Sequence, residues 1–210
     1  MKGLKKTRVM LVDDHFVVRM GLAGSLDAEH DLRVVAECGS GEQAVELYRA
    51  ERPNVVVMDW RLPGMSGVEV TAAIRAEYPE ARVVMLSNYD GEEDVYQAVE
   101  AGVAAYLPKS VEREELLLAI RSVVAGKPYF PPAIAARLAA RQNRPEISPR
   151  EMDVLRLIVR GASNKEIAKA LGIVEITVKL HVSKLLEKLG VADRTQAATT
   201  AIQRGIVHLD

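Results

Sequence analysis

Five short apolar runs, separated by helical patterns, limit what the first half of this chain can fold into. Each run has the length of a buried strand, and Val55–Met58 is also rich in β-branched residues. Helical patterns of about 10–15 residues lie between the runs, as in "SGEQAVELYRAE" and "EREELLLAIRSVV". Strands that alternate with helices predict an α/β fold, a doubly wound five-stranded parallel sheet with helices on both faces. The runs are Val9–Val12, Arg33–Ala36, Val55–Met58, Val83–Leu86 and Val103–Leu107.

Beyond residue 126 the pattern is helical only. Prolines at 128, 131, 132 and 145 bracket a segment rich in Ala and Arg, which predicts a linker over 127–145 with one short helix. The sequences "SPRE" and "SNKE" are capping boxes, which mark the first residues of two further helices. Residues 146–210 are therefore expected to form a small all-α domain. We expect its helices over 149–160, 164–171, 175–189 and 194–206.

Charge divides the chain at similar places. Residues 1–126 carry a net charge of −7, residues 127–144 carry +4 and residues 145–210 carry +2. An acidic part joined to a basic part predicts different partners for the two. Cys38 is the only cysteine, which excludes an intrachain disulfide and disfavours a cysteine metal site. The first apolar run is too short for a signal peptide and no segment approaches a membrane span, so we expect a soluble cytoplasmic protein.

Polar residues follow four of the five runs, where each predicted strand ends. They are Asp13, Asp14, Asp59, Ser87 and Lys109. The carboxyl ends of parallel strands share one edge of the sheet, where such folds bind ligands. Three carboxylates there repel one another unless a cation lies among them, and oxygen ligands suit Mg²⁺. One aspartate could become an aspartyl phosphate whose oxygens contact the lysine and the serine. Each acid alone is more often a loop cap, but the five together favour a phosphoryl-accepting site.

Four stretches resemble the receiver domain of two-component response regulators, over about residues 7–126: "VMLVDDH", "VVVMDWRLPGMSGVEVTAAIR", "VVMLSNYD" and "AGVAAYLPKS". The resemblance implies a flavodoxin-like fold for the domain of residues 1–126. It also implies that Asp59 accepts a phosphoryl group from the phosphohistidine of a sensor histidine kinase, with Mg²⁺ as cofactor. The implied Mg²⁺ ligands are Asp14, Asp59, the backbone carbonyl of Arg61 and, mainly through water, Asp13.

The same resemblance assigns the residues that respond to phosphorylation. Ser87 and Lys109 are implied to contact the phosphoryl oxygens. Tyr106 matches the aromatic residue of the family that turns inward when Ser87 moves toward the phosphate. An alternative interpretation makes Tyr106 only a half-buried aromatic residue of a strand.

Three bulky or rigid residues beside the site bear on how the phosphorylated state behaves. Pro108 precedes Lys109, whereas many relatives have proline directly after the lysine, and its ring biases Leu107 toward an extended conformation. Arg61 and Tyr89, each two residues past a site residue, are bulky enough to shield an acyl phosphate from water. These features affect the expected lifetime of the phosphorylated state and leave the site itself unchanged.

The stretch "SNKEIAKALGIVEITVKLHVSKLLEKLG" has the order of a helix-turn-helix, with a capped short helix, a turn containing glycine and a longer helix. One face of the longer helix is an apolar stripe of Val178, Val182, Leu185, Leu186 and Leu189. The opposite face carries Lys179, Leu180, Ser183, Lys184 and Lys188. One interpretation is a solvated charged face. The other is DNA contact, because lysines reach guanine edges or phosphates and an apolar side chain meets a thymine methyl.

The tail over about 146–208 resembles the LuxR-type DNA-binding domain, and its union with a receiver is similar to the NarL/FixJ class of transcription factors. The resemblance makes 175–189 the recognition helix in the major groove and the last helix a dimer contact on DNA. It implies base-edge contacts by Lys179, Leu180 and Ser183, and phosphate contacts by Lys184, Lys188 and Arg194.

Val174 departs from the family at the position that caps the recognition helix, where relatives commonly have Ser or another small polar residue. Losing a side-chain N-cap costs about 1 kcal/mol. Either Glu175 or Thr177 compensates locally, or this helix start is looser than usual. His181 on the same helix is expected to pack or to contact phosphate rather than to bind a metal.

These features predict a phosphorylation-dependent, DNA-binding transcription regulator. Its expected partners are a sensor histidine kinase, paired half-sites of double-stranded DNA and, when phosphorylated, a second copy of the chain. It would not be an enzyme beyond its own phosphotransfer and dephosphorylation. One alternative is a DNA-binding protein whose receiver is a phosphorylation-independent scaffold. A phosphatase-type enzyme is disfavoured because Arg61 stands where a second acid is needed, and a flavin site because no Ser/Thr-rich loop follows the first strand.

Overall fold

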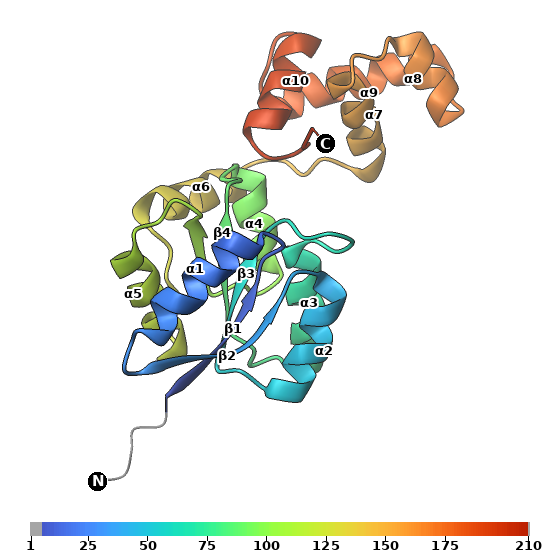
Figure 1. Cartoon of the computed structure of the whole chain (residues 1–210). Coiled ribbons are helices and arrows are strands. Elements are labelled where there is room, and N and C mark those ends of the chain that lie inside the picture. Colours follow the sequence, from blue (N-terminus) through green and yellow to red (C-terminus); the bar gives the residue numbers. More distant parts are fainter. Residues whose placement is uncertain (1–5, 210) are drawn as a thin grey trace. The chain divides into compact units, whose positions relative to one another are not determined.

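The computed structural model describes residues 6–209, so residues 1–5 and residue 210 of the two predicted domains lie outside the described residues. The described chain forms two compact units (Figure 1). One holds the residues up to Asp90 together with Val95–Ala136, and the other holds Gly91–Asp94 together with the residues from Arg137 onward. Each unit has a hydrophobic core of its own. None of the helices formed by the described residues combines the length and apolar character that a membrane span requires.

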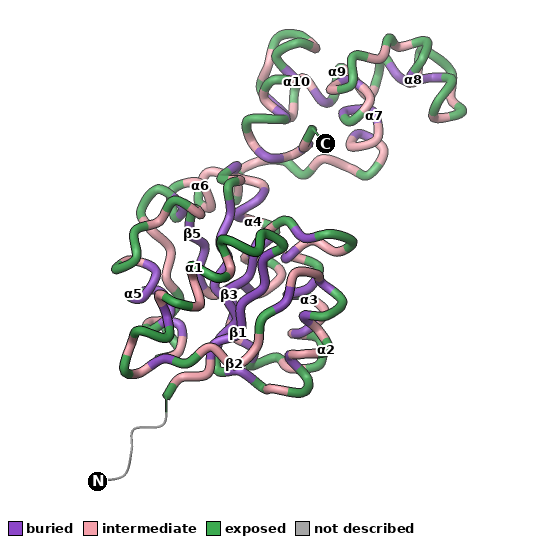
Figure 2. Tube along the Cα trace, viewed as in Figure 1, coloured by how far each residue is buried: buried purple, intermediate pink, exposed green. Residues whose placement is uncertain are grey.

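The first unit is built on a parallel sheet of five strands in the order β2-β1-β3-β4-β5. Every residue of β3 and β4 is buried, which is why their sequences are continuous apolar runs (Figure 2). This arrangement confirms the predicted fold class. The strands are β1 (Thr7–Val12), β2 (Leu32–Cys38), β3 (Val55–Asp59), β4 (Val83–Ser87) and β5 (Ala105–Pro108).

Helices cover both faces of this sheet (Figure 1). Val9, Leu11 and Val57 belong to one core cluster with Leu26 of α1 and Ile120 of α5, so α1 and α5 cover the same face. Right-handed crossovers in this strand order place α2, α3 and α4 on the other face. The helices are α1 (Phe16–Asp27), α2 (Gly41–Glu51), α3 (Gly67–Glu77), α4 (Glu92–Glu100) and α5 (Arg113–Val124).

The strand register brings the polar strand ends together. The strand order reverses beside β1, which lies between β2 and β3, and ligands of such sheets bind at this reversal. Val12 pairs with Met58, so the residues that follow them, Asp13 and Asp59, are neighbours at the carboxyl edge. The pairing of β4 with β5 brings Lys109 to the same edge.

The second unit is helical, as predicted. Its core is formed by apolar residues of all four helices, including Leu155, Ile167, Leu185 and Ala201. A further helix, α6 (Pro132–Gln142), lies in the predicted linker. The four helices are α7 (Pro149–Val159), α8 (Asn164–Leu171), α9 (Glu175–Leu189) and α10 (Arg194–Gln203).

In β5 and α10, a glycine that ends a helix makes the element shorter than predicted. β5 begins at Ala105, since the Val103 N–H still donates to the Ala98 carbonyl at the end of α4, where Gly102 has φ 92°. α10 stops at Gln203 rather than at residue 206 because Gly205 has φ 71°. Positive φ costs glycine little, and helices commonly end there.

The helix starts of the second unit differ in how they are capped. Ser148 and Ser163 accept hydrogen bonds from the backbone of Glu151 and Glu166, and both predicted capping boxes are present. Val174 precedes α9 with extended backbone and makes no side-chain cap hydrogen bond. Val174 is 64% exposed. In the folded chain, α9 therefore starts without a side-chain cap from Val174.

We predict that Val174→Ser stabilises α9. The serine hydroxyl would accept a backbone N–H of the first turn, which is worth about 1 kcal/mol relative to an uncapped start. Amide hydrogen exchange of the intact protein, read on the first turn of α9, should slow accordingly. Val174→Ala is the control, because alanine caps no better than valine. Equal exchange rates in the two variants would contradict the prediction.

Candidate functional site

Lys109 lies between two buried carboxylates at the carboxyl edge of the sheet. Its Nζ is 2.7 Å from Asp59 Oδ2 and 2.8 Å from Asp13 Oδ2. The exposed fractions of Asp13 and Asp59 are only 3% and 4%. Buried carboxylates need a counter-charge or hydrogen bonds, and this lysine supplies both. The Lys109 N–H also donates to the Ser87 carbonyl, which fixes the residue at the end of β5.

Burial and the neighbouring charges shift the pKa values of this group. Burial raises the pKa of Asp59, and the Asp13 charge adds to this, although the Lys109 hydrogen bond acts in the opposite direction. For Lys109, burial alone would lower the pKa, but hydrogen bonds to Asp13 and Asp59 outweigh it and the pKa is raised. Lys109 is therefore firmly cationic at neutral pH, and Asp59 is a poorly hydrated carboxyl group beside a fixed positive charge.

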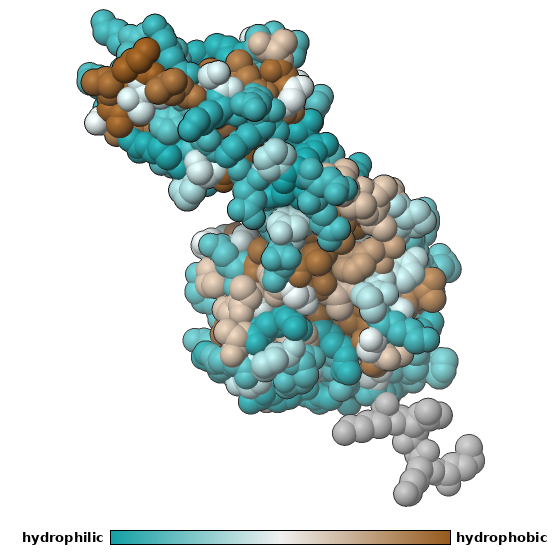
Figure 3. Space-filling view, turned by 180° about the vertical axis from the view of Figure 1, so that it is seen from behind, coloured by the Kyte–Doolittle hydropathy of each residue, from teal (hydrophilic) through white to brown (hydrophobic). Residues whose placement is uncertain are grey.

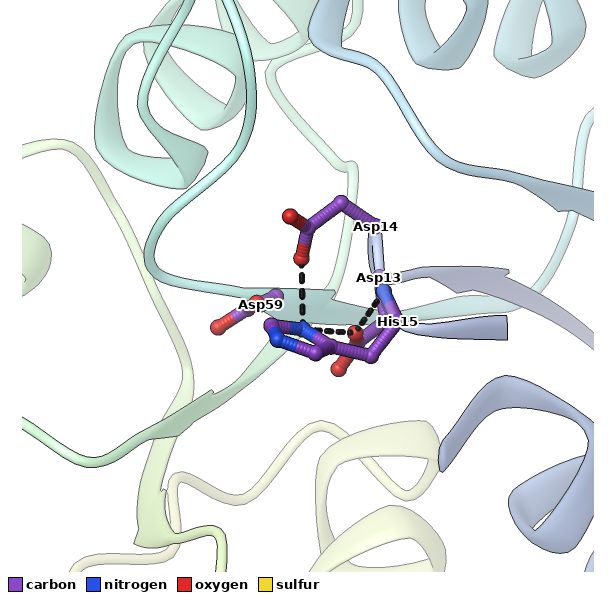
Figure 4. A group of neighbouring side chains, drawn as sticks. All are labelled: Asp13, Asp14, His15 and Asp59. Carbon is purple, nitrogen blue, oxygen red and sulfur yellow. Dashed lines mark hydrogen bonds and ion pairs between the residues drawn. The ribbon is translucent and has the colours of Figure 1, made fainter. Parts of the chain in front are cut away.

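Asp14 and His15 complete the acidic group (Figure 4). The His15 Nδ1 atom is 2.7 Å from Asp14 Oδ1 and 3.3 Å from Asp13 Oδ1, and the His15 N–H donates to Asp13 Oδ1. One ligand atom from each of Asp13, Asp14, His15 and Asp59 lies within 4.8 Å of the others. Sequence reasoning did not include His15, although its place directly after the two aspartates was the available signal.

The donor atoms of this group fit a hard divalent cation. The group holds three carboxylates and only one lysine, so it retains an excess of negative charge that such an ion would neutralise. Carboxylate oxygens are the ligands that Mg²⁺ prefers. The backbone of Arg61 is also in place, because its N–H donates to Asp59 Oδ1 at 3.3 Å. The backbone carbonyl of Arg61 remains a predicted ligand of Mg²⁺.

Ser87 and Tyr106 meet at the backbone of Tyr89 rather than at Asp59. Ser87 is almost fully buried, and its Oγ accepts the Tyr89 N–H at 2.8 Å. Tyr106 is fully buried, and its hydroxyl donates to the Tyr89 carbonyl at 2.5 Å. Tyr106 is therefore not the half-buried aromatic residue of the alternative interpretation. Tyr89 links the two predicted switch residues through its backbone, a connection that the sequence pattern did not reveal.

The outward face of α9 is the second candidate site. Lys179, Leu180, Ser183 and Lys184 are all exposed, as predicted, and Leu180 is 60% exposed. Ile176, one turn before Leu180 on the same face, is 64% exposed and was missed. It lies outside the buried stripe, which was the available signal. Hydrophobic side chains are visible among hydrophilic ones on the surface of this unit (Figure 3).

Two other residues predicted to face phosphates make contacts within the second unit. Lys188 Nζ donates to the Glu146 carbonyl and to Glu151 Oε2, the latter at 2.6 Å. Arg194 donates to the Ala162 carbonyl at 2.6 Å. Both cations therefore help to hold helices together, which competes with any role at a phosphate. His181 belongs to neither of the two groups of described residues that could hold a metal ion.

Family comparison gives the two units their identity. Residues 9–121 match the response regulator receiver domain, and residues 145–201 match the luxR family of bacterial regulatory proteins. The chain is a LuxR-type response regulator. Such regulators join a receiver to a helix-turn-helix DNA-binding domain.

Relatives of this response regulator match it along nearly its whole length. The response regulator protein VraR of Staphylococcus aureus is 37% identical over 206 residues, which cover 96% of this chain and 99% of VraR. The crystal structure of the response regulator ChrA, from a heme-sensing two-component system, is 38% identical with a TM-score of 0.58, and the match covers 97% of this chain and 100% of ChrA. A structure of RcsB with DNA has a TM-score of 0.70 at 23% identity over 93% and 98% of the chains, a likeness of fold.

We predict that Glu151→Gln destabilises the second unit of the response regulator at neutral pH but not in acid. Burial acts to raise the pKa of Glu151, but hydrogen bonds from Lys188 and Ser148 outweigh it and the pKa is lowered. The ionised carboxylate thus stabilises the folded state above the unfolded pKa, and this contribution is lost as pH falls through the folded pKa. Glutamine keeps the capping box and removes the charge.

The expected difference from wild type is about 1 kcal/mol near pH 7, because one partly exposed lysine is left without its carboxylate. Urea unfolding of the full chain between neutral and acid pH measures it. Glu166→Gln is the matched control, since Glu166 forms a capping box with Ser163 at an exposed position. If the difference in unfolding free energy between Glu151→Gln and wild type stayed constant across the pH range, the proposed role of the ionised Glu151 carboxylate would be wrong.

Proposed function

We propose that this response regulator is a phosphorylation-dependent transcription regulator of a two-component system. Asp59 accepts a phosphoryl group from a sensor histidine kinase, and the phosphorylated state favours dimerisation and DNA binding. The observation that carries the proposal is the Asp13–Lys109–Asp59 group at the reversal point of the sheet, in a chain that also exposes a basic and apolar face of a helix-turn-helix. The geometry supports it, because the side chains proposed for phosphotransfer lie together at one edge of the sheet.

Phosphotransfer uses the carboxylate of Asp59 as the nucleophile. A carboxylate oxygen forms a bond to phosphorus while the P–N bond to the kinase histidine breaks, and the bonding electrons remain on the imidazole. Lys109 offsets negative charge on the transferring oxygens. Asp13, Asp14, Asp59 and the Arg61 carbonyl would hold Mg²⁺, which when bound supplies positive charge to the carboxylates and the phosphoryl oxygens.

The contacts at Tyr89 support a route from the site to the surface. To reach a phosphoryl oxygen, the Ser87 hydroxyl exchanges its bond from the Tyr89 N–H for one to the phosphate. The Tyr89 carbonyl accepts the hydrogen bond of the Tyr106 hydroxyl. A shift of the loop that holds Tyr89 therefore moves the hydrogen-bond acceptor of Tyr106. Ser87 and Tyr106 thus have two hydrogen-bonding arrangements, one without and one with the phosphoryl group. A change between two such arrangements can alter the surface that a second copy contacts.

DNA recognition is assigned to α9. Lys179, Leu180 and Ser183 are proposed to face base edges, with Lys184 nearer the phosphates, and Ile176 joins them as an apolar contact. Lys188 and Arg194 reach phosphates only if they exchange the contacts that they make within the unit. A dimer would present two copies of α9 to two half-sites.

Intact mass after incubation with acetyl phosphate and Mg²⁺ tests the phosphoacceptor. Wild type should gain one phosphoryl increment, and the increment should vanish without Mg²⁺ and in Asp59→Asn, because no nucleophile remains. Trp60 follows Asp59 directly and is the only tryptophan, so its fluorescence reports Mg²⁺ binding in both proteins. An increment retained in Asp59→Asn would place the acceptor elsewhere, and none in wild type would favour the scaffold alternative.

Binding to duplexes selected from a random pool tests the face of α9. Leu180→Ala should weaken binding to the selected duplex by about 1–3 kcal/mol, with little effect on random duplex, because a thymine methyl contact is lost. Lys184→Ala should weaken binding to the selected and the random duplex alike. It should also lower the slope of log affinity against log salt concentration by about 1, because one phosphate contact is lost. Arg156→Ala, at an exposed position of α7, is the control. Equal losses on selected and random DNA for Leu180→Ala would contradict the base-edge role.

A further inference from the structure

One arginine of α1 reaches back to the backbone of the acidic group. Arg19 Nη1 donates to the carbonyl of Asp13, six residues earlier in the chain. The Arg19 side chain is only 17% exposed, and its Nε atom lies 3.7 Å from Glu37 Oε2 on β2. Its guanidinium carbon also lies 5.8 Å from the centre of the Phe16 ring. Three contacts therefore hold the guanidinium group, and one of them is with the peptide that joins Asp13 to Asp14.

The Arg19 contact stands where the ladder between β1 and β2 ends. Val12 and Cys38 are the last paired residues of the two strands, and the Asp13 N–H still donates to the Cys38 carbonyl. The Asp13 carbonyl accepts from the arginine side chain instead of from β2. Buried backbone polar groups need a partner, so a chain without this guanidinium would turn the peptide to find another donor.

The peptide between Asp13 and Asp14 sets the direction of the second acid. The side chains of both acids lie in the acidic group (Figure 4). The Asp13 carboxylate is fixed, because its Oδ1 accepts the His15 N–H and its Oδ2 faces Lys109. Asp14 is exposed, and its carboxylate contacts the ring of His15, the next residue in the chain. Since that neighbour moves with it, the place of the Asp14 carboxylate depends on the rotation of its own peptide, which the Arg19 bond holds.

We propose that Arg19 is a positioning residue for Mg²⁺, because its bond to the Asp13 carbonyl keeps the Asp14 carboxylate directed into the acidic group. This role rests on the proposed function, in which Asp14 and Asp59 hold the ion used in phosphotransfer. Arg19 acts through the backbone and is not itself a ligand. Removing a group that orients metal ligands typically weakens metal binding about 10–100-fold, and Arg19 orients one ligand among several, which favours the lower limit.

Charge and position make opposite predictions for this arginine. A cation near three carboxylates competes with Mg²⁺ for their negative charge, so an effect of charge alone would make Mg²⁺ bind more tightly once Arg19 is removed. The charge of Arg19 is paired with that of Glu37, however, and the pair as a whole is neutral. Glu37 is exposed, so salt screens what remains of the field. The positioning effect therefore dominates, and removal of Arg19 weakens the binding of Mg²⁺.

Titration of the full chain with Mg²⁺, followed by Trp60 fluorescence and by amide NMR shifts, tests this role. Arg19→Ala should raise the Kd for Mg²⁺ about tenfold. Arg19→Lys can still donate to the Asp13 carbonyl and should recover part of the loss. Glu37→Gln is the matched control, because it removes the charge that pairs with Arg19 and keeps the bond to Asp13. Its Kd should stay within about twofold of wild type.

A double variant shows whether the arginine acts through the second acid. Asp14→Asn removes one proposed ligand, and adding Arg19→Ala to it should raise the Kd by at most about twofold more. Loading from acetyl phosphate gives a further readout. Arg19→Ala should reach the same phosphoryl increment as wild type at saturating Mg²⁺, with its midpoint at about tenfold more Mg²⁺. A protein that had only lost structure would fall short at saturation.

The possible results separate the role of Arg19 from the proposed function. A Kd for Arg19→Ala equal to or below that of wild type would overturn the positioning role, and so would an equal loss in Glu37→Gln. A full tenfold loss in the Asp14→Asn background would overturn it too, as would a wild type that binds no Mg²⁺. A wild type that binds Mg²⁺ but gains no phosphoryl increment would overturn the proposed function alone, and the Kd values would still decide on Arg19.

Discussion

The ammonium group of Lys109 is the contact on which the site depends. Two carboxylates are almost fully buried at the edge of the sheet, and charges in such a place persist only when they are paired. Lys109 reaches both, because the register of β5 beside β4 sets its backbone at the Ser87 carbonyl. The position of one cation is thus fixed by the pairing of apolar strands. A one-residue slip in that pairing would turn the lysine to the other face and leave the acids without a partner.

Much of this arrangement was predictable from the sequence because the parallel sheet converts strand ends into neighbours. The apolar runs gave the strands, and Asp59 and Lys109 came together once their strands were adjacent. The first residues of two helices were predictable from the capping boxes at Ser148 and Ser163. A capping box is a local feature, because it needs only a serine three residues before a glutamate. Features determined by backbone spacing and burial were therefore recovered, within two or three residues at the element ends.

Features that depend on where long side chains reach were not predictable. Lys188 and Arg194 looked like phosphate ligands from their place on the helices, but each finds a carbonyl or carboxylate many residues away in the chain. Tyr89 looked like a bulky shield, and the structure makes it the residue that links Ser87, Tyr106 and Arg61. A flexible side chain satisfies whichever partner the tertiary structure offers, and periodicity carries no information about that choice.

Weak binding by a single helix-turn-helix suits the proposed control by dimerisation. The DNA-binding part carries a net charge of only +2, and two of its cations, Lys188 and Arg194, already serve the fold. Few phosphate contacts remain, so one copy should bind a half-site weakly and with a shallow salt dependence. In the proposed dimer, a second copy would raise the effective concentration at the neighbouring half-site without any new contact to DNA. The modest charge of the tail would thereby make affinity depend on assembly, and assembly is the step that the chemistry at Asp59 is proposed to govern.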